Sequence, residues 1–405
     1  MSSKKRAIFM DAPSSPKTAQ WPRAVGDATG GRLGGGRPNG RRWRAAAPIL
    51  VTFGIIWLTY LAIVAVVIAT DPYDIYRWGS ALQSKRSDMP SDRLRAINVA
   101  AKKASIDTFL VGGSTTEMYS PNEISAALGG KAIAYNLSYG GPRPMDRDIV
   151  LDQLAENSQA KHIIITFDWM YILGSETIRR NFPEFLYDEE ITDDIRMVDL
   201  TALRRTLRVL LGLANHGPDD GETYTHLVAE QRDDFHQPAR MAELDRLVEE
   251  FRPVIDAPSG KTCSDFGAVE EQLVPRVHTF SEKGVKIDIL MPILSYVKYY
   301  HSVSNISPTI LDEVLISRKC LVEAIDGLPN VRIFGFDDDP AVAGDLGNFR
   351  DPGHIDNPAL LKRTLASLST GEKRLTAANI DEYLRRIRSE VKNYHVRNSY
   401  LERTR

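Results

Sequence analysis

The sequence predicts an α/β protein, a three-layer α/β/α domain with a five-stranded parallel sheet, a helical insertion and one N-terminal transmembrane helix. Two observations predict it. Short apolar runs alternate with helical patterns between residues 106 and 360, as strands and crossover helices do in a parallel sheet. An uncharged apolar segment occupies residues 48–69. The composition, 43% hydrophobic and 26% charged, excludes a disordered or fibrous chain.

The N-terminal tail, residues 1–47, differs in charge from the rest of the chain. It holds ten of the 51 basic residues and two of the 53 acidic ones, which leaves 41 basic against 51 acidic residues in 48–405. The tail is rich in Gly, Arg and Pro at 30–42, so we expect a disordered cytoplasmic segment. Because the body is acidic, we expect it to bind no nucleic acid.

The apolar segment at 48–69 has the length of a transmembrane helix. Its 22 residues span roughly 33 Å, against about 30 Å for the hydrocarbon core of a bilayer. Three arginines between 41 and 44 precede it, and Asp71 and Asp74 follow it, so the positive-inside rule keeps the N-terminus in the cytoplasm. A cleaved signal peptide is the alternative, but its basic region and apolar core would both be unusually long. We therefore expect an uncleaved signal anchor in contact with membrane lipid.

Five apolar runs are the expected strands, and most are continuously apolar, as strands buried on both faces are. They lie at residues 106–111, 132–137, 162–167, 285–291 and 331–336. A juxtamembrane segment at 70–105 precedes the α/β domain at 106–360, and C-terminal helices are expected at 361–405. The interval between the third and fourth strands is too long for one crossover, which indicates a helical insertion near 175–260.

The first expected strand is followed by Gly112-Gly113-Ser114-Thr115-Thr116. Ligands bind at the carboxyl ends of the strands in such sheets, so Ser114 would lie exposed at a strand-to-helix turn. That position suits a nucleophile whose own N–H also stabilises an oxyanion. The alternative is a helix-capping serine, because the Ser-Thr-Thr-Glu sequence also matches a capping box.

The second expected strand leads into Gly140-Gly141-Pro142, at the same edge of the sheet. The backbone N–H of Gly140 or Gly141 is a candidate second oxyanion donor. A plain turn is the alternative.

The fifth expected strand is followed by Asp351-Pro352-Gly353-His354. A carboxylate three residues from a histidine can hold the imidazole in the tautomer that accepts a serine proton. Ser114, His354 and Asp351 are therefore candidates for nucleophile, general base and orienting carboxylate.

The order Ser, Asp, His, with the last two on one loop, resembles the SGNH (GDSL-type) hydrolase superfamily. Its first block reads Gly-Asp-Ser, whereas this chain has Gly112-Gly113-Ser114; its second block supplies an oxyanion glycine, matched by Gly140 or Gly141. Its fifth block, D-x-x-H, is matched here, but the Gly-x-Asn-Asp of the third block is absent after the third strand. The resemblance implies a flavodoxin-like sheet and a serine acyl-enzyme mechanism.

Within that superfamily the anchored, exported layout is similar to bacterial proteins of surface-polysaccharide acetylation. This resemblance implies an O-acyltransferase or esterase at the bacterial inner membrane, with its C-terminal domain in the periplasm. It also implies an acyl group, acetyl being the expected one, a carbohydrate substrate and a membrane-embedded acyl donor protein as partner. A non-catalytic scaffold or polysaccharide-binding subunit is the alternative, which the departures in blocks one and three favour.

Asp168, Trp169 and Tyr171 follow the third strand, where an aromatic face and a carboxylate would suit sugar recognition. Structural aromatic residues at the base of the insertion are an equal alternative. No histidine pair has metal-ligand spacing near carboxylates, so neither a metal nor another cofactor is expected. Cys263 and Cys320 fall in the exported part, where a disulfide and two buried thiols are both compatible with the sequence.

Overall fold

The computed structural model describes residues 40–70, 105–156, 159–174, 177–178, 182–187, 200–211 and 231–403. The predictions for the tail at 1–39, for the juxtamembrane residues 71–104 and for residues 212–230 of the expected insertion lie outside them. The chain divides into two compact units, residues 1–59 and 60–405. The mixed α/β architecture belongs to the second unit.

Helix α1 (Gly40–Thr70) contains the predicted transmembrane segment. Its stretch Ala47–Thr70 has 24 residues and a mean hydropathy of 2.5 within its most apolar window. At about 1.5 Å per residue, this stretch is long enough to cross a membrane.

The main sheet has six strands in the order β2-β1-β3-β4-β5-β8. They are β1 (Thr108–Val111), β2 (Ala134–Asn136), β3 (His162–Thr166), β4 (Lys286–Leu290), β5 (Val331–Phe334) and β8 (Arg374–Leu375). The first five are mutually parallel and lie within the five predicted runs. All residues of β1 and β3 are buried, which is why their sequences, apart from His162, are apolar or β-branched rather than alternating.

The sixth strand corrects the prediction of a five-stranded sheet. β8 pairs antiparallel with the end of β5, through Ile333 with Leu375 and Phe334 with Arg374. Two residues show no hydrophobic period, so the sequence has no pattern from which this edge strand could be recognised. A separate hairpin of β6 (Phe349–Asp351) and β7 (His354–Ile355) follows β5 along the chain.

Helices and short helical turns separate the strands. In the first part of the α/β unit they are η1 (Ser114–Thr116), α3 (Pro121–Ala127), α4 (Pro144–Glu156), α5 (Trp169–Leu173), η2 (Glu184–Leu186), α6 (Leu200–Leu210), α8 (Pro238–Phe251), η4 (Cys263–Asp265) and η5 (Ala268–Leu273). They continue with α9 (Val274–Glu282), α10 (Tyr296–Asn305), α11 (Ile310–Ile325), α12 (Pro340–Ala343), η6 (Leu346–Asn348), α13 (Pro358–Thr370), α14 (Ile380–Lys392) and α15 (Ser399–Arg403). The capping box at Ser114 is not formed; the one in this region belongs to Ser120 and Glu123, at the start of α3.

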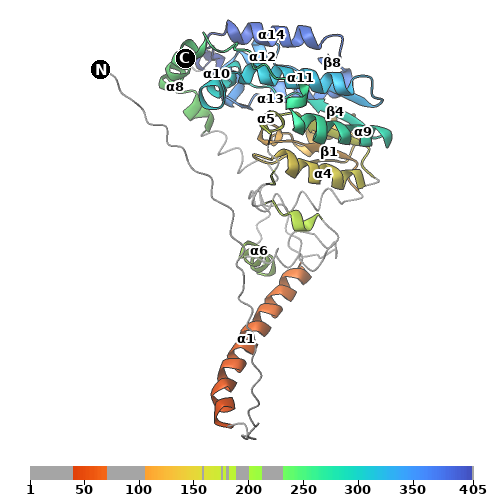
Figure 1. Ribbon diagram of the computed structural model, residues 1–405, viewed down its shortest axis with the longest axis vertical. Helices are drawn as coiled ribbons and strands as arrows, with labels where there is room; N and C mark the ends of the chain where they lie inside the picture. Colours follow the sequence, from red (N-terminus) through yellow and green to blue (C-terminus); the bar gives the residue numbers. More distant parts are fainter. Residues whose placement is uncertain are drawn as a thin grey trace, which may run out of the picture. The chain divides into compact units, whose positions relative to one another are not determined.

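The helices pack in two groups. α3 contacts α13 and β2, whereas α9 contacts α4, α11 and β4. α10, α11 and α14 lie side by side (Figure 1). Of the insertion expected near 175–260, the structure describes the helices η2, α6 and α8.

A disulfide joins Cys263 of η4 to Cys320 of α11. Of the two alternatives that the sequence leaves open, the structure therefore contains the disulfide. It ties the segment after α8 to a helix that packs on α9, α10 and α14.

Candidate active site

Ser114, His354 and Asp351 meet in one chain of hydrogen bonds. Ser114 Oγ lies 2.8 Å from His354 Nε2, and His354 Nδ1 lies 2.8 and 2.7 Å from the two carboxylate oxygens of Asp351. An ionised carboxylate only accepts, so Nδ1 carries the ring proton and Nε2 accepts from the serine hydroxyl. The structure thus places the three predicted residues in the arrangement that nucleophilic catalysis by serine requires.

The β6–β7 hairpin brings Asp351 and His354 together. Asp351 ends β6, His354 begins β7, and the amide of Gly353 donates to Asp351 Oδ1 over 2.8 Å. Burial alone would raise the pKa of Asp351, but its hydrogen bonds with His354 and with the Gly353 amide hold this pKa below its usual value. Asp351 is therefore ionised at neutral pH and able to orient the imidazole.

Residues outside the β6–β7 hairpin hold it in place, and no sequence motif indicates them. Arg232 forms an ion pair with Asp356, and His236 Nε2 donates to the carbonyl of Phe349 over 2.9 Å. His236 Nδ1 in turn accepts from Asn398 Nδ2 at 2.9 Å. Burial lowers the pKa of His236, so the ring is neutral and can make both bonds. No local pattern connects position 236 with position 349, which is why the sequence could not reveal the contact.

The nucleophile turn, residues 112–116, is held by a buried polar network. Thr116 Oγ1 donates to the carbonyl of Gly113 at 3.1 Å and lies 2.9 Å from Ser138 Oγ. Asn136 Nδ2 donates to the carbonyl of Thr116 over 2.8 Å. A Cβ at Gly112 would approach Thr116 Oγ1 to 2.2 Å, so the network leaves room only for glycine there.

The predicted oxyanion donors lie around this turn. Ser114 is the first residue of η1, so its N–H precedes any intrahelical partner. Tyr139 N donates to the carbonyl of Gly112 at 3.4 Å, which brings the segment after β2 beside the end of β1. Gly140 and Gly141 follow and are exposed, and Gly141 has a φ of +63°, which glycine adopts without steric cost. Their oxyanion role stays a prediction.

The three residues predicted to contact substrate are placed differently from one another. Trp169 is half-buried, with its ring 5.9 Å from that of Tyr299. Tyr171 is buried and stacked on Phe167, and burial raises its pKa to about 12. This placement leaves Trp169 as the candidate for sugar contact and favours a structural role for Tyr171.

Asp168 is only 6% exposed. One carboxylate oxygen accepts from the amide of Met170 at 3.1 Å, capping α5, and the other pairs with Arg147. The placement therefore favours a structural role over the predicted contact with substrate.

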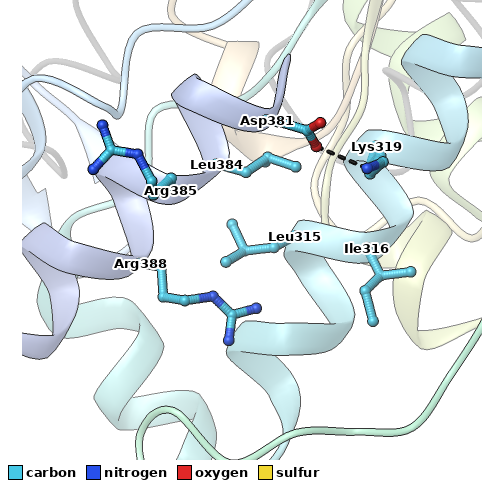
Figure 2. A pocket seen from close by; sticks show the side chains of 7 residues that line it. All are labelled: Leu315, Ile316, Lys319, Asp381, Leu384, Arg385 and Arg388. Carbon is cyan, nitrogen blue, oxygen red and sulfur yellow. Dashed lines mark hydrogen bonds and ion pairs between the residues drawn. The ribbon is translucent and has the colours of Figure 1, made fainter. Parts of the chain in front are cut away.

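The described residues contain no group of three or more His, Cys, Asp or Glu placed to hold a metal ion. An open groove of about 270 Å³ lies between α11 and α14, with Leu315, Ile316 and Leu384 beside Lys319, Asp381, Arg385 and Arg388 (Figure 2). Lys319 pairs with Asp381 across it at 2.7 Å. None of its lining residues belongs to the Ser114–His354–Asp351 triad, so we assign it no part in the site.

In comparisons with known proteins, no family model matches the chain, and no curated protein matches it either.

Proposed function

We propose that this protein is a membrane-anchored serine O-acyltransferase or esterase of the SGNH type, acting on acyl esters of a surface polysaccharide. The observation that carries the proposal is the unbroken hydrogen-bond chain from the Ser114 hydroxyl through His354 to Asp351, whose nucleophile and base are 240 residues apart in the sequence. A capping or structural serine has no need of an oriented imidazole.

The reaction would proceed in two half-reactions. Ser114 Oγ attacks the ester carbonyl carbon while its proton passes to His354 Nε2. Collapse of the tetrahedral intermediate breaks the ester C–O bond, and the leaving alcohol takes the proton from His354. A sugar hydroxyl or water then gives its proton to His354 and attacks the acyl carbon. Collapse of this second intermediate breaks the bond from the acyl carbon to Ser114 Oγ, which leaves with the proton from His354. Transfer and hydrolysis differ only in this second nucleophile.

Backbone amides would stabilise the oxyanion. The amide of Ser114 and that of Gly140 or Gly141 are the donors we propose, because the two segments lie beside each other at the ends of β1 and β2. Trp169 would offer an aromatic face to a sugar ring. The missing Asn of the third block leaves this hole with two donors.

The strand order supports the SGNH assignment and the three-layer arrangement within the proposal. The order β2-β1-β3-β4-β5 reverses direction after β2, and right-handed crossovers then put the helix leaving β1 on the opposite face from the helices that follow β2. That assigns α3 and α13 to one layer and α4, α9 and α11 to the other. Ser114 follows β1, the strand at the reversal point, where α/β sheets bind ligands.

Membrane anchoring and export complete the proposal. Large apolar side chains between Ile49 and Leu58 are exposed, unlike those of a core helix, and would contact lipid. The disulfide between Cys263 and Cys320 fits an oxidising compartment such as the bacterial periplasm, with the N-terminus in the cytoplasm. A membrane-embedded acyl donor protein is the partner we propose for the transferase reaction.

A serine-directed fluorophosphonate probe tests the proposal on the full-length protein in detergent. We expect labelling of the wild type and none of Ser114→Ala or His354→Ala. Ser120→Ala is the matched control: it removes the cap of α3, costs about 1 kcal/mol, and should leave labelling intact. Folded wild-type protein that takes up no probe would instead favour the non-catalytic scaffold. The departures from blocks one and three of the SGNH pattern also favour that alternative.

A further inference from the structure

A buried ion pair, Arg147 with Asp168, lies directly against the nucleophile turn. Arg147 projects from α4 and is completely buried, and Asp168 follows β3. A Cβ on Gly113 would lie 2.5 Å from Asp168 Oδ2 and 3.1 Å from Arg147 Nη2. The residue before Ser114 is therefore in contact with both members of the pair.

We propose that Asp168, held by Arg147, is a positioning residue that fixes Ser114 from behind and takes the place of a carboxylate at position 113. This inference rests on the proposed function, in which Ser114 is the nucleophile. It adds a supporting pair that the hydrogen-bond chain of the triad does not include.

Space, not backbone conformation, requires glycine at 113. Its φ of −103° and ψ of −165° are extended values that any residue adopts. The steric conflict comes only from the side chains of Asp168 and Arg147. A side chain at 113 and the carboxylate of Asp168 thus exclude each other, which gives a physical reason for glycine where the Gly-Asp-Ser pattern has aspartate.

The pair is itself rigidly held. Arg147 Nη1 donates to the carbonyl of Thr166 at 3.0 Å, and its guanidinium lies 5.0 Å from the ring centroid of Tyr171. Burial by itself would lower the pKa of Arg147, but the adjacent Asp168 carboxylate raises it above its usual value. Arg147 is therefore charged. The pair links α4 to the ends of β1 and β3. Motion of any of these three elements would therefore be transmitted to Ser114.

Catalytic geometry makes the consequence measurable. A displacement of about 1 Å between nucleophile and base can slow a reaction about 100-fold. We expect Asp168→Ala to slow fluorophosphonate labelling of Ser114 by about this factor in folded, full-length protein, and Asp168→Asn, which keeps the shape and an acceptor oxygen, to slow it less.

The matched control is Asp288→Ala. Asp288 is also a completely buried carboxylate paired with an arginine, Arg332, but it lies within β4 and not beside Ser114. Asp288→Ala should lower the unfolding temperature by about as much as Asp168→Ala does. It should leave the labelling rate of folded protein unchanged. Equal slowing in both variants would show that lost stability, not lost positioning, explains the effect.

Relocating the carboxylate is the most specific test. Gly113→Asp alone should abolish labelling because its side chain collides with Asp168. The double variant Gly113→Asp/Asp168→Ala removes the collision and again offers a carboxylate to Arg147, so its labelling rate should exceed that of either single variant. A folded double variant no faster than Asp168→Ala would overturn the inference.

Amide hydrogen exchange separates failure of this inference from failure of the proposed function. Exchange in the peptide 112–119, where Thr116 N donates to the carbonyl of Gly113 at 3.0 Å, should quicken in Asp168→Ala and not in Asp288→Ala. If wild-type protein takes no label but exchange responds in this way, the catalytic proposal fails and the positioning stands. Unchanged exchange together with unchanged labelling in Asp168→Ala overturns the positioning alone. Should Asp168→Ala not fold, Asp168→Asn is read by the same two measurements.

Discussion

The molecule contains two hydrogen-bonded histidine–aspartate pairs whose surroundings differ. His354 and Asp351 lie 2.7 Å apart in a hairpin, and the side chains are 26% and 37% exposed. His162 and Asp288 lie at the same distance, but between neighbouring strands, at 8% and 0% exposure. Distance alone therefore does not distinguish a proton-transfer pair from a structural one.

The remaining partners make the distinction. In the hairpin pair, the second ring nitrogen of His354 faces the Ser114 hydroxyl. The hydrogen bonds of the Asp351 carboxylate within the described part of the chain are to the imidazole and to one amide. In the strand pair, Asp288 also binds Arg332 through both oxygens, at 2.7 Å each. A carboxylate saturated by a guanidinium stabilises the sheet, whereas one committed to an imidazole beside a hydroxyl can support catalysis.

Replacing each histidine by glutamine should give the largest contrast. His354→Gln removes the general base, so we expect esterase turnover to fall by about 10⁴-fold or more with little change in stability. His162→Gln should leave turnover of folded protein unchanged and cost about 1–3 kcal/mol, because Asp288 loses one partner but keeps Arg332. Hydrolysis of a chromogenic acetyl ester and thermal unfolding measure the two effects. Comparable turnover losses in both variants would remove the distinction between the pairs.

Replacing each aspartate by asparagine should give a somewhat smaller contrast. Asp351→Asn keeps the shape but offers an amide that favours the wrong tautomer of His354, and we expect a loss of about 10³–10⁴-fold in turnover. Asp288→Asn should lower stability by about 3–5 kcal/mol, since it leaves Arg332 partly unpaired, with turnover of the folded fraction retained. A nearly fully active Asp351→Asn would mean that the carboxylate does not orient the imidazole.

The sequence predicts the hairpin pair and not the strand pair for a physical reason. Asp351 and His354 are three residues apart, and parallel strands bring their carboxyl ends to one edge, so the motif and the strand order were sufficient to associate them with Ser114. His162 and Asp288 are 126 residues apart in two buried strands. Their pairing depends on strand register, which no local pattern encodes.

The same limit applies to the support of the nucleophile. The sequence indicates Asp168 as a candidate because it follows a strand, and its side chain lies beside the site. Its partner Arg147 lies on α4, whose sequence shows nothing unusual. The sequence does not decide whether the two cysteines form a disulfide, because bonding depends on the separation of their Cα atoms, which is 5.5 Å here. Strand ends and short motifs are readable from sequence, whereas partners from other elements require the fold.

Loss of the disulfide tests whether stability and turnover are separable at all. The bond closes a sequence separation of 57 residues and joins η4 to α11, neither of which holds a residue of the two histidine pairs. Cys263→Ala/Cys320→Ala should lower the free energy of unfolding by about 2–4 kcal/mol and leave turnover at temperatures below unfolding as in the wild type. Turnover that falls in step with stability would show that destabilisation anywhere disturbs the triad, and the contrasts above would lose their meaning.

Acid titration should give the smallest and most graded contrast between the two aspartates. Burial would raise the pKa of Asp288, but hydrogen bonds from His162 and Arg332 hold this pKa below its usual value. The hydrogen bond from His354 likewise holds the pKa of Asp351 below its usual value. A lowered folded-state pKa contributes stability that is complete above the unfolded value of about 3.9 and is lost as pH falls through the folded value. Stability should therefore decline on acidification below about pH 4.

The two asparagine variants measure each share of this decline. Asp288→Asn should flatten the loss of stability between about pH 5 and pH 2 more than Asp351→Asn does, because the side chain of Asp288 is wholly buried whereas that of Asp351 is 37% exposed and better screened by water. Urea unfolding of full-length protein in detergent at a series of pH values gives both slopes. If Asp351→Asn flattened the curve more, the hairpin pair would be the stronger structural contact, and its assignment to catalysis would have to rest on the Ser114 hydroxyl alone.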